Sequence, residues 1–176
     1  MNEGPRDIDV VSVALGDRRP STLVLKGIDM LIQAATAKPD LRIVVIGLGS
    51  PNTVEVPENI TFLPPVPNDS LSSYYQRAKV YAQLSLSEGF PNALCEAMLC
   101  GCVPLVSAVG AMPEVVGDAG VIVPLRDTSL VIKQLDRALS MVSTANAWKA
   151  RRRVEANYSE ERRATELIGL IGSSLP

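Results

Sequence analysis

Two glutamates flank a short glycine-containing turn near the middle of the chain, and their spacing indicates a ligand site. Glu88 precedes Gly89, and Glu96 follows Glu88 after seven intervening residues. Gly89 lets the backbone approach a ligand closely, and the free N–H groups at the start of the next helix attract an anion. Carboxylates repel phosphate but accept hydrogen bonds from hydroxyls. The pattern predicts a receptor for a sugar joined through a diphosphate to a nucleoside, with ordinary surface glutamates as the alternative interpretation of these residues alone.

The elements on either side of the turn decide where this chemistry would lie. Residues 80–84 are an apolar run typical of a buried strand, and Pro91 is predicted to be the first residue of the following helix. Gly101 stands where that helix should end. The turn at 88–90 therefore connects the carboxyl end of a strand to a helix, which is where open α/β sheets bind ligands.

The turn belongs to a longer ordered set of segments that resembles one family. The segments are residues 88–98, 100–106 and 110–124, preceded by 26–34 and 43–49. Together they resemble the C-terminal half of a group 1 retaining glycosyltransferase with the GT-B fold, a family with two glutamates separated by seven residues. The resemblance covers most of the chain, from about Val10 to Tyr158.

The resemblance implies roles for individual residues. In the family, the lysine that matches Lys26 contacts the donor diphosphate. Without the resemblance, Lys26 would be interpreted as a solvated surface side chain. Glu88 would hold hydroxyls of the sugar and Glu96 the ribose, with Lys26 and Glu88 as the catalytic pair. The departing diphosphate would be stabilised electrostatically, without a cofactor or a metal. The other implied donor-binding positions are Gly89, Phe90, Pro91, Asn92, Gly47, Gly49, Val66 and Gly110.

Two local features near the N-terminus complete the predicted site. Lys26 is expected at the start of a helix over 27–37, where a cation opposes the helix dipole. The chain also departs from the family pattern, which usually places an arginine in a Gly-Arg-Leu context after the first strand. Here the nearest arginines are Arg18 and Arg19, in a predicted loop over 15–25. We expect one of them to reach the phosphates, or the phosphate clamp to be incomplete.

Hydrophobic periodicity predicts the architecture that holds these residues. Strands and helices alternate along the chain, which predicts a Rossmann-like α/β domain with three layers (αβα) and a parallel sheet of about six strands. We interpret residues 1–176 as one nucleotide-sugar donor-binding domain, and 158–176 as a C-terminal helix that packs toward a missing N-terminal domain. The expected strands are 8–14, 41–46, 59–63, 80–84, 103–107 and 120–124, and the helix after 63 is expected to be capped by residues 68–70.

Composition excludes several other classes of protein. A net charge of −2 and 4% aromatic residues argue against a nucleic-acid platform. The cysteines Cys95, Cys100 and Cys102 are not spaced as paired metal ligands, and the chain has no histidine, so we interpret them as buried apolar residues. We expect a cytoplasmic protein. The basic run 151–153 leaves open a peripheral contact with the inner face of the membrane, although a solvated helix face is the simpler interpretation.

The predicted function is that of the donor-binding half of a retaining hexosyltransferase. It would transfer sugar from a nucleotide-diphosphate sugar to an acceptor in polysaccharide or glycoconjugate synthesis, and its partners would be this donor and an N-terminal acceptor domain of the same protein. With 176 residues the chain supplies one of the two domains of a GT-B enzyme, so we expect a fragment that is inactive alone. The alternatives are a non-catalytic nucleotide-sugar binding or regulatory module, and another GT-B enzyme such as an epimerase.

Overall fold

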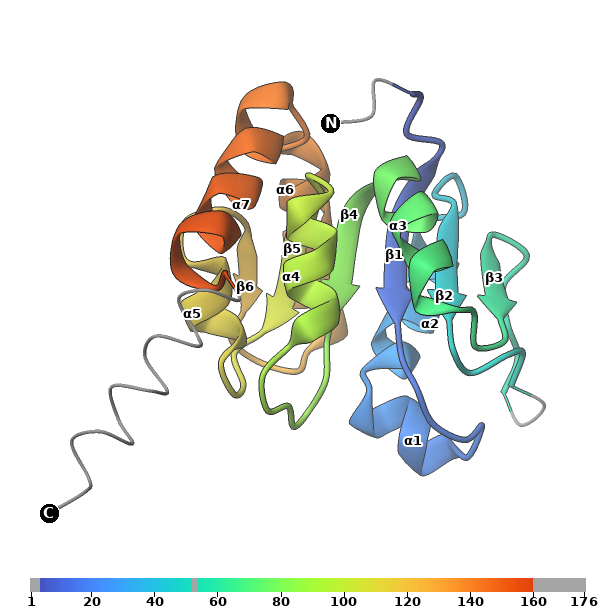
Figure 1. Ribbon diagram of the computed structural model, residues 1–176. Helices are drawn as coiled ribbons and strands as arrows, with labels where there is room; N and C mark the ends of the chain where they lie inside the picture. The colour runs from blue at the N-terminus through green and yellow to red at the C-terminus, as the bar shows by residue number, and fades with distance from the viewer. Residues whose placement is uncertain (1–3, 52–53, 160–176) are drawn as a thin grey trace, which may run out of the picture.

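A parallel sheet forms the centre of the computed structural model, which describes residues 4–51 and 54–159 (Figure 1). Its six strands follow the order β3-β2-β1-β4-β5-β6, each hydrogen-bonded in parallel to its neighbours. Helices cover both faces, which confirms the predicted Rossmann-like α/β fold. The strands are β1 (Ile8–Val13), β2 (Ile43–Ile46), β3 (Ile60–Leu63), β4 (Ala78–Gln83), β5 (Val103–Ser107) and β6 (Val121–Val123). The helices are α1 (Pro20–Leu25), α2 (Ile28–Ala37), α3 (Asn68–Arg77), α4 (Asn92–Leu99), α5 (Met112–Val116), α6 (Thr128–Ser140) and α7 (Thr144–Asn157).

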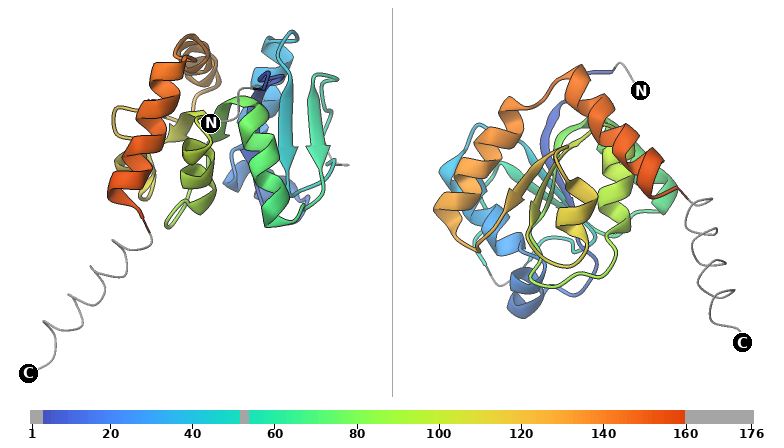
Figure 2. Two further views of the ribbon diagram at one scale, coloured as in Figure 1. Left: turned by 45° about the horizontal axis from the view of Figure 1, so that its top comes forward. Right: turned by 90° about the vertical axis from the view of Figure 1, so that its left-hand side faces the viewer.

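The strand order fixes the position of the ligand-binding edge. From β1 the chain moves outward through β2 to β3, and it then returns to place β4 on the other side of β1. The helices α2 and α3, which lead away from β1 and back to β4, lie on opposite faces of the sheet (Figure 2). Such a switch point, between the carboxyl ends of two central strands, is where doubly wound sheets bind their ligands.

Two apolar clusters hold the helices on the sheet, one on each face. On one face, α1, α2 and α6 pack on the strands, and on the other α3, α4, α5 and α7 do so. β2 is buried over its whole length, because helices cover both of its faces. Fully buried members of the two clusters include Ile28, Leu31, Leu105 and Leu135 on the first face, and Tyr75, Tyr81, Met98 and Met112 on the second.

Capping residues mark the ends of three helices. The Asp127 carboxylate accepts a hydrogen bond from the Leu130 N–H at 2.8 Å and so caps α6, and the Ser143 hydroxyl caps α7 in the same way. Gly101 follows α4 in the left-handed conformation, with a φ of 79°, and ends that helix as predicted. Asp127 and Ser143 thus mark where a loop ends and a helix begins, and Gly101 marks where α4 gives way to the loop before β5.

Other local expectations were wrong. The predicted loop over 15–25 contains the short helix α1, which begins with Pro20. α3 begins at Asn68 with Pro67 as its N-cap and without a side-chain cap, so residues 68–70 do not cap it as predicted. The last described helix, α7, ends at Asn157. Most of the predicted helix over 158–176 lies outside the described residues.

Within residues 4–51 and 54–159, no helix is both long enough and apolar enough to span a bilayer.

Candidate functional site

The junction between α1 and α2 is pinned against the loop that follows β4. Gly27 has a φ of +69°, and a Cβ atom there would lie 2.0 Å from the carbonyl oxygen of Leu84. Only glycine permits this approach. The Leu86 N–H also donates a hydrogen bond of 2.8 Å to the carbonyl of Leu25. Two segments far apart in sequence therefore meet at the switch point, and Lys26 is fixed between them.

Lys26 faces Glu88 across this junction. Lys26 Nζ lies 3.0 Å from Glu88 Oε1, and the Ser85 hydroxyl donates to the same oxygen at 2.8 Å. The Lys26 and Glu88 side chains are 27% and 17% exposed, so water shields their charges only in part. The structure thus brings the predicted catalytic pair together as an ion pair at the carboxyl edge of the sheet.

The helix expected over 27–37 begins one residue later than predicted, at Ile28. Gly27 is the N-cap of α2, whereas Lys26 is the C-cap residue of α1. A cation is favourable at the C-terminus of a helix. Lys26 therefore lies at the favourable end of α1 as well as immediately before the N-cap of α2, and what distinguishes it is its contact with Glu88.

Glu88 is held in its ionised form. Burial raises the pKa of the Glu88 carboxyl, but the hydrogen bonds from Ser85 and Lys26 and the charge of Lys26 outweigh burial. The pKa of Glu88 therefore lies below its ordinary value. At neutral pH this carboxylate is a hydrogen-bond acceptor, as a residue that reads hydroxyl groups needs to be.

The loop after β5 completes the site from a third direction. Gly110 has a φ of +54°, and a Cβ atom there would lie 2.2 Å from the carbonyl oxygen of Glu88 and 3.2 Å from that of Gly89. The Gly110 backbone therefore packs directly on the turn at 88–89. α5 begins two residues later at Met112, so this helix helps to fix the loop.

The start of α4 is open in the way that an anion site requires. Pro91, which was predicted as the first helical residue, is the N-cap of α4, so the helix begins one residue later at Asn92, and no side chain caps the first turn. A Cβ atom built on Gly89 would meet nothing within 4 Å. Asn92 is exposed, and Phe90 is 39% exposed with its ring 5.6 Å from that of Tyr158.

Glu96 lies on α4, farther along the helix than the turn. Its side chain is exposed, and the Tyr75 hydroxyl donates to Glu96 Oε2 at 3.4 Å. Burial raises the pKa of Tyr75, so its hydroxyl stays protonated and remains a donor. Glu96 thus has a fixed partner on one side and solvent on the other.

The remaining predicted positions lie toward β2 and β3. The Arg18 guanidinium donates to the Ser50 carbonyl at 3.3 Å, whereas Arg19 Nε donates to the Asp17 carboxylate at 2.6 Å. Both arginine contacts are exposed. The N–H groups of Gly47 and Gly49 both donate to the carbonyl of Leu63, which closes the loop after β2, and Val66 is partly buried in the loop after β3.

Sequence reasoning missed several polar side chains beneath the site. Ser85 accepts a hydrogen bond from Ser107 through its carbonyl and donates to Glu88 through its hydroxyl. Gln83 is buried at the end of β4. The available signal was the occurrence of glutamine and serine inside the apolar run at 80–85, where only apolar residues are expected in a buried parallel strand.

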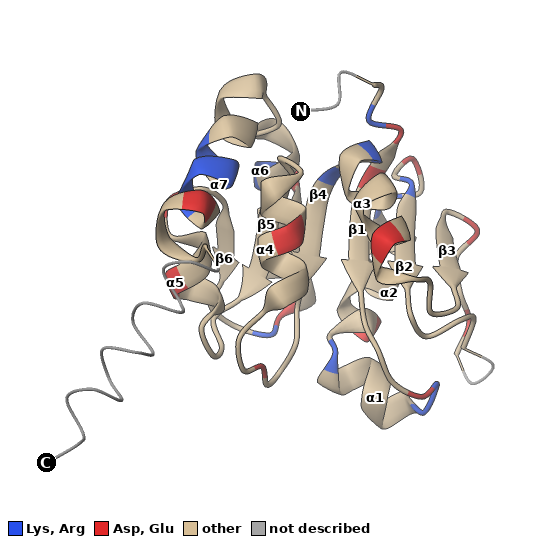
Figure 3. Cartoon of the chain, viewed as in Figure 1, with Lys and Arg blue, Asp and Glu red and all other residues tan. Residues whose placement is uncertain are grey.

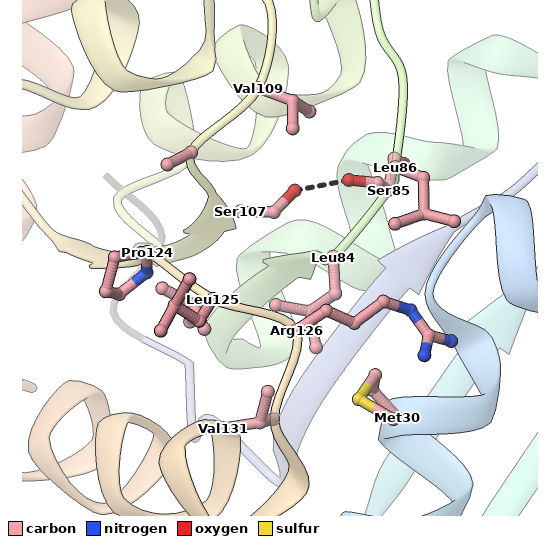
Figure 4. A pocket seen from close by; sticks show the side chains of 12 residues that line it. Met30, Leu84, Ser85, Leu86, Ser107, Val109, Pro124, Leu125, Arg126 and Val131 are labelled. Carbon is pink, nitrogen blue, oxygen red and sulfur yellow. Dashed lines mark hydrogen bonds between the residues drawn. The ribbon is translucent and has the colours of Figure 1, made fainter.

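A pocket of about 180 Å³ has Ser85 in its lining (Figure 4). Its lining is mostly aliphatic, and the Arg126 side chain at its edge pairs with Asp29. An aliphatic lining offers few hydrogen-bond partners to a sugar, whereas Lys26 and Glu88 supply charged groups that suit a hydrophilic ligand. The lining residues are Met30, Leu84, Ser85, Leu86, Ser107, Ala108, Val109, Val123, Pro124, Leu125, Arg126 and Val131.

The basic run at 151–153 lies on α7, where blue segments gather in Figure 3. The guanidinium of Arg151 pairs with Glu155 at 2.7 Å, and that of Arg153 donates to the carbonyl of Val115 at 2.8 Å. The guanidinium of Arg152 lies 5.8 Å from the centre of the Trp148 ring. Each of these three cations therefore has a partner within the chain.

No metal centre emerges from the part of the chain that the structure describes. Among residues 4–51 and 54–159, no three histidine, cysteine, aspartate or glutamate side chains are grouped so as to hold an ion. Burial raises the pKa of the Cys102 thiol to about 12, and the Cys102 thiol donates to the Tyr75 carbonyl at 3.1 Å.

The chain is similar to known glycosyltransferases. Residues 21–155 match the family described as "Glycosyl transferases group 1". A D-inositol 3-phosphate glycosyltransferase of Mycolicibacterium smegmatis is 31% identical over 142 residues, which cover 70% of this chain and 33% of that protein. The chain thus spans about a third of the length of this relative.

Solved structures show the same fold. A sucrose-phosphate synthase from Thermosynechococcus elongatus superposes with a TM-score of 0.76 at 24% identity, covering 96% of this chain and 46% of that one. An Anabaena protein in complex with UDP-glucose gives a TM-score of 0.75 at 16% identity, covering 95% of this chain and 49% of that one. Because the family match extends from α1 to α7, the chain belongs to the group 1 glycosyltransferases.

Proposed function

We propose that this chain is the donor-binding half of a retaining glycosyltransferase that moves a sugar from a nucleotide-diphosphate sugar to an acceptor. The observation that carries the proposal is the ion pair between Lys26 and Glu88, which stands beside the uncapped start of α4 at the switch point of the sheet. It offers one cation, one carboxylate and the N-terminal end of a helix within one small region.

The diphosphate would lie between Lys26 and the first turn of α4. The Lys26 ammonium and the positive N-terminal end of α4 supply positive potential, and an open Gly89 lets phosphate oxygens come near the backbone. These groups would stabilise the negative charge that develops as the sugar leaves with retained anomeric configuration. No metal or cofactor is needed in this scheme.

The carboxylates would recognise hydroxyl groups on either side of the diphosphate. Glu88, ionised and partly buried, would accept hydrogen bonds from the sugar, and Glu96, exposed on α4, would accept them from the ribose. Val66 and the loop at 47–49 would flank the base. Gly110 would act by setting the position of the turn at 88–89.

The comparisons support the donor class. The relatives are named glycosyltransferases, and one structural neighbour was solved with UDP-glucose. Because the chain spans only a fraction of their lengths, we propose that an N-terminal acceptor domain completes the enzyme and that the chain alone does not turn over. A cytoplasmic location, a peripheral contact of α7 with the membrane and a role in polysaccharide or glycoconjugate synthesis belong to the same proposal.

A non-catalytic binding module is the second candidate, and one observation favours it. Arg19 is engaged by Asp17, so it offers the phosphates less than a free guanidinium would. The Arg18 guanidinium donates to the Ser50 carbonyl. If Arg18 does not reach the phosphates either, the clamp has Lys26 as its single cation.

Titration calorimetry against UDP, GDP and ADP, followed by their sugar derivatives, tests the proposal. We expect selective binding of one nucleotide and a loss of that binding in Glu96→Ala. Glu58→Ala is the matched control, because it removes an equal charge from the exposed segment before β3, at the opposite edge of the sheet. If the folded chain binds none of these ligands, or if Glu58→Ala weakens binding as much as Glu96→Ala, the proposed donor site is wrong.

A further inference from the structure

Ser85 carries a buried hydroxyl directly after β4, at the edge of the candidate site. The residue is 2% exposed, and within the described part of the chain it shares burial of a polar side chain only with Ser12 and Gln83. A hydroxyl in an apolar environment destabilises a fold unless it finds a partner. The Ser85 hydroxyl finds one in Glu88, because it donates to Oε1 of that carboxylate at 2.8 Å.

The backbone around Ser85 is fixed by two other parts of the fold. The hydroxyl of Ser107, the last residue of β5, donates to the Ser85 carbonyl at 2.5 Å. The residues before and after Ser85 are both held by the α1–α2 junction, through the close approach of Gly27 on one side and a backbone hydrogen bond on the other. A serine hydroxyl is placed by a single side-chain torsion. Ser85 is therefore a donor with little freedom to move.

Lys26, the other donor to Oε1 of Glu88, is of a different kind. Its ammonium lies 3.0 Å from that oxygen, at the end of a flexible four-carbon stem that is 27% exposed. In the proposed function this ammonium also faces the diphosphate. A flexible cation supplies charge, whereas a neutral hydroxyl on a fixed backbone supplies direction. Because both donors bind the same oxygen, the carboxylate keeps acceptor sites for the hydroxyls of a ligand.

We propose that Ser85, anchored by Ser107, is the positioning residue for Glu88 and keeps this carboxylate in place while Lys26 serves the diphosphate. The two donors would thus divide their tasks, with the charge coming from α1 and the orientation from the loop after β4. The inference rests on the proposed function only for the identity of the ligand, since the orientation of Glu88 can be measured without one.

The first test follows Glu88 directly. Glutamate labelled with carbon-13 at the side-chain carboxyl allows the titration of Glu88 to be observed by NMR, with its signal identified by its loss in Glu88→Gln. In Ser85→Ala we expect the titration midpoint to rise toward the ordinary value of 4.5, because a hydrogen bond to the charged form is lost. The anchor from Ser107 survives in this variant, because it binds the backbone carbonyl of residue 85.

Salt separates the two donors. Lys26→Met should also raise the midpoint of Glu88, but the difference from the wild type should be smaller at about 1 M salt than at about 0.1 M, because salt screens the attraction between charges. The rise in Ser85→Ala should persist at high salt, since the hydroxyl carries no net charge. A rise in Ser85→Ala that disappears at high salt would mean that Ser85 acts through the ion pair, and it would overturn the assignment of orientation to Ser85.

Ser12→Ala is the matched control, because it removes an equally buried hydroxyl from β1. It should leave the Glu88 midpoint unchanged. Should Ser85→Ala fail to fold, as judged by circular dichroism, Ser85→Cys decides the question, since a thiol has a similar shape but is a weak donor. The proposal is wrong if the midpoint stays unchanged in the folded variant of Ser85, or if Ser12→Ala shifts it as much.

The second test links Ser85 to the sugar. Calorimetry with UDP, GDP and ADP, each compared with its glucose derivative, should show about tenfold weaker binding of the sugar nucleotide to Ser85→Ala and unchanged binding of the bare nucleotide. Lys26→Met should weaken the binding of both. If Ser85→Ala weakens both ligands equally or neither of them, Ser85 does not position Glu88 for the sugar. If the wild-type chain binds none of these ligands, the proposed function fails, while the NMR titration still decides the role of Ser85.

Discussion

Replacing Gly110 with alanine should separate the architecture of the site from its chemistry. The new Cβ atom would lie 2.2 Å from the carbonyl oxygen of Glu88, in a backbone with a φ of +54°. The left-handed conformation costs a non-glycine residue about 1–2 kcal/mol, and relief of the overlap adds about 1–3 kcal/mol. We therefore expect Gly110→Ala to lower the free energy of unfolding by about 2–5 kcal/mol, or to displace the loop after β5.

Two other glycines in the site region serve as controls of graded severity. Gly49 has a φ of +65° with open space around it, so Gly49→Ala should carry only the conformational cost of about 1–2 kcal/mol. Gly89 does not have a left-handed φ, and a Cβ atom added there would meet no atom within 4 Å. The free energy of unfolding of Gly89→Ala should therefore lie within about 0.5 kcal/mol of the wild-type value.

Urea denaturation of the three variants, combined with calorimetry of nucleotide binding, checks this order. Gly89→Ala should keep its stability but lose affinity, because its methyl group points into the space proposed for the diphosphate. Gly110→Ala should lose both. A Gly110→Ala variant that is as stable as the wild type and binds as well would refute the close packing of these loops as the basis of the site.

Three further predictions follow from the contacts described above. The pKa of Glu88 in the folded state lies below its ordinary value of 4.5, so the ionised carboxylate stabilises the folded chain above pH 4.5. This stabilisation is lost as the pH falls through the folded-state pKa. The difference in urea midpoint between the wild type and Glu88→Gln should therefore become smaller in acid. Arg153→Ala should destabilise the chain by about 2 kcal/mol in thermal unfolding by removing donors to two backbone carbonyls, whereas Lys149→Ala, which removes an exposed ion pair, should cost less than about 1 kcal/mol; equal effects would count against the role of Arg153. Leu105→Ala, at a fully buried position, should lower the free energy of unfolding by about 2–5 kcal/mol, and Leu125→Ala, at a position 69% exposed, should change it little, as judged by chemical denaturation.

The fold was accessible from the sequence because its strands and long helices carry strong local patterns. The run at 43–46 contains only valine and isoleucine, and α6 carries both a capping aspartate and an apolar face. α1 lacks such signals. It has six residues, a single buried side chain in Leu23 and no side-chain cap, so only Pro20 marked its start. A helix this short is stabilised by its packing, which the local sequence does not report.

The candidate site was accessible only in part, for a related reason. The turn at 88–89 and the start of α4 follow from local spacing, whereas the contact of Lys26 with Glu88 joins residues that are 62 positions apart. A local sequence motif gives no information on contacts between residues so far apart in the chain, so only the family resemblance placed Lys26 and Glu88 in one site. Gln83 was different, because a polar residue inside an apolar strand was visible in the sequence but was not interpreted.

The central position of β1 has a consequence for how the protein forms during synthesis. Among the strands of this sheet β1 leaves the ribosome first, yet it pairs with β2 on one side and with β4 on the other. Its second edge therefore stays unpaired until residues 78–83 have been made, and the site is complete only when Gly110 has packed on the turn at 88–89. Nucleotide affinity acquired during translation would thus report the packing of the loop after β5 on the turn at 88–89. A nascent chain that stops before residue 78 should expose one edge of β1 to chaperones, whereas a chain that stops before Gly110 should lack the competence to bind the proposed donor.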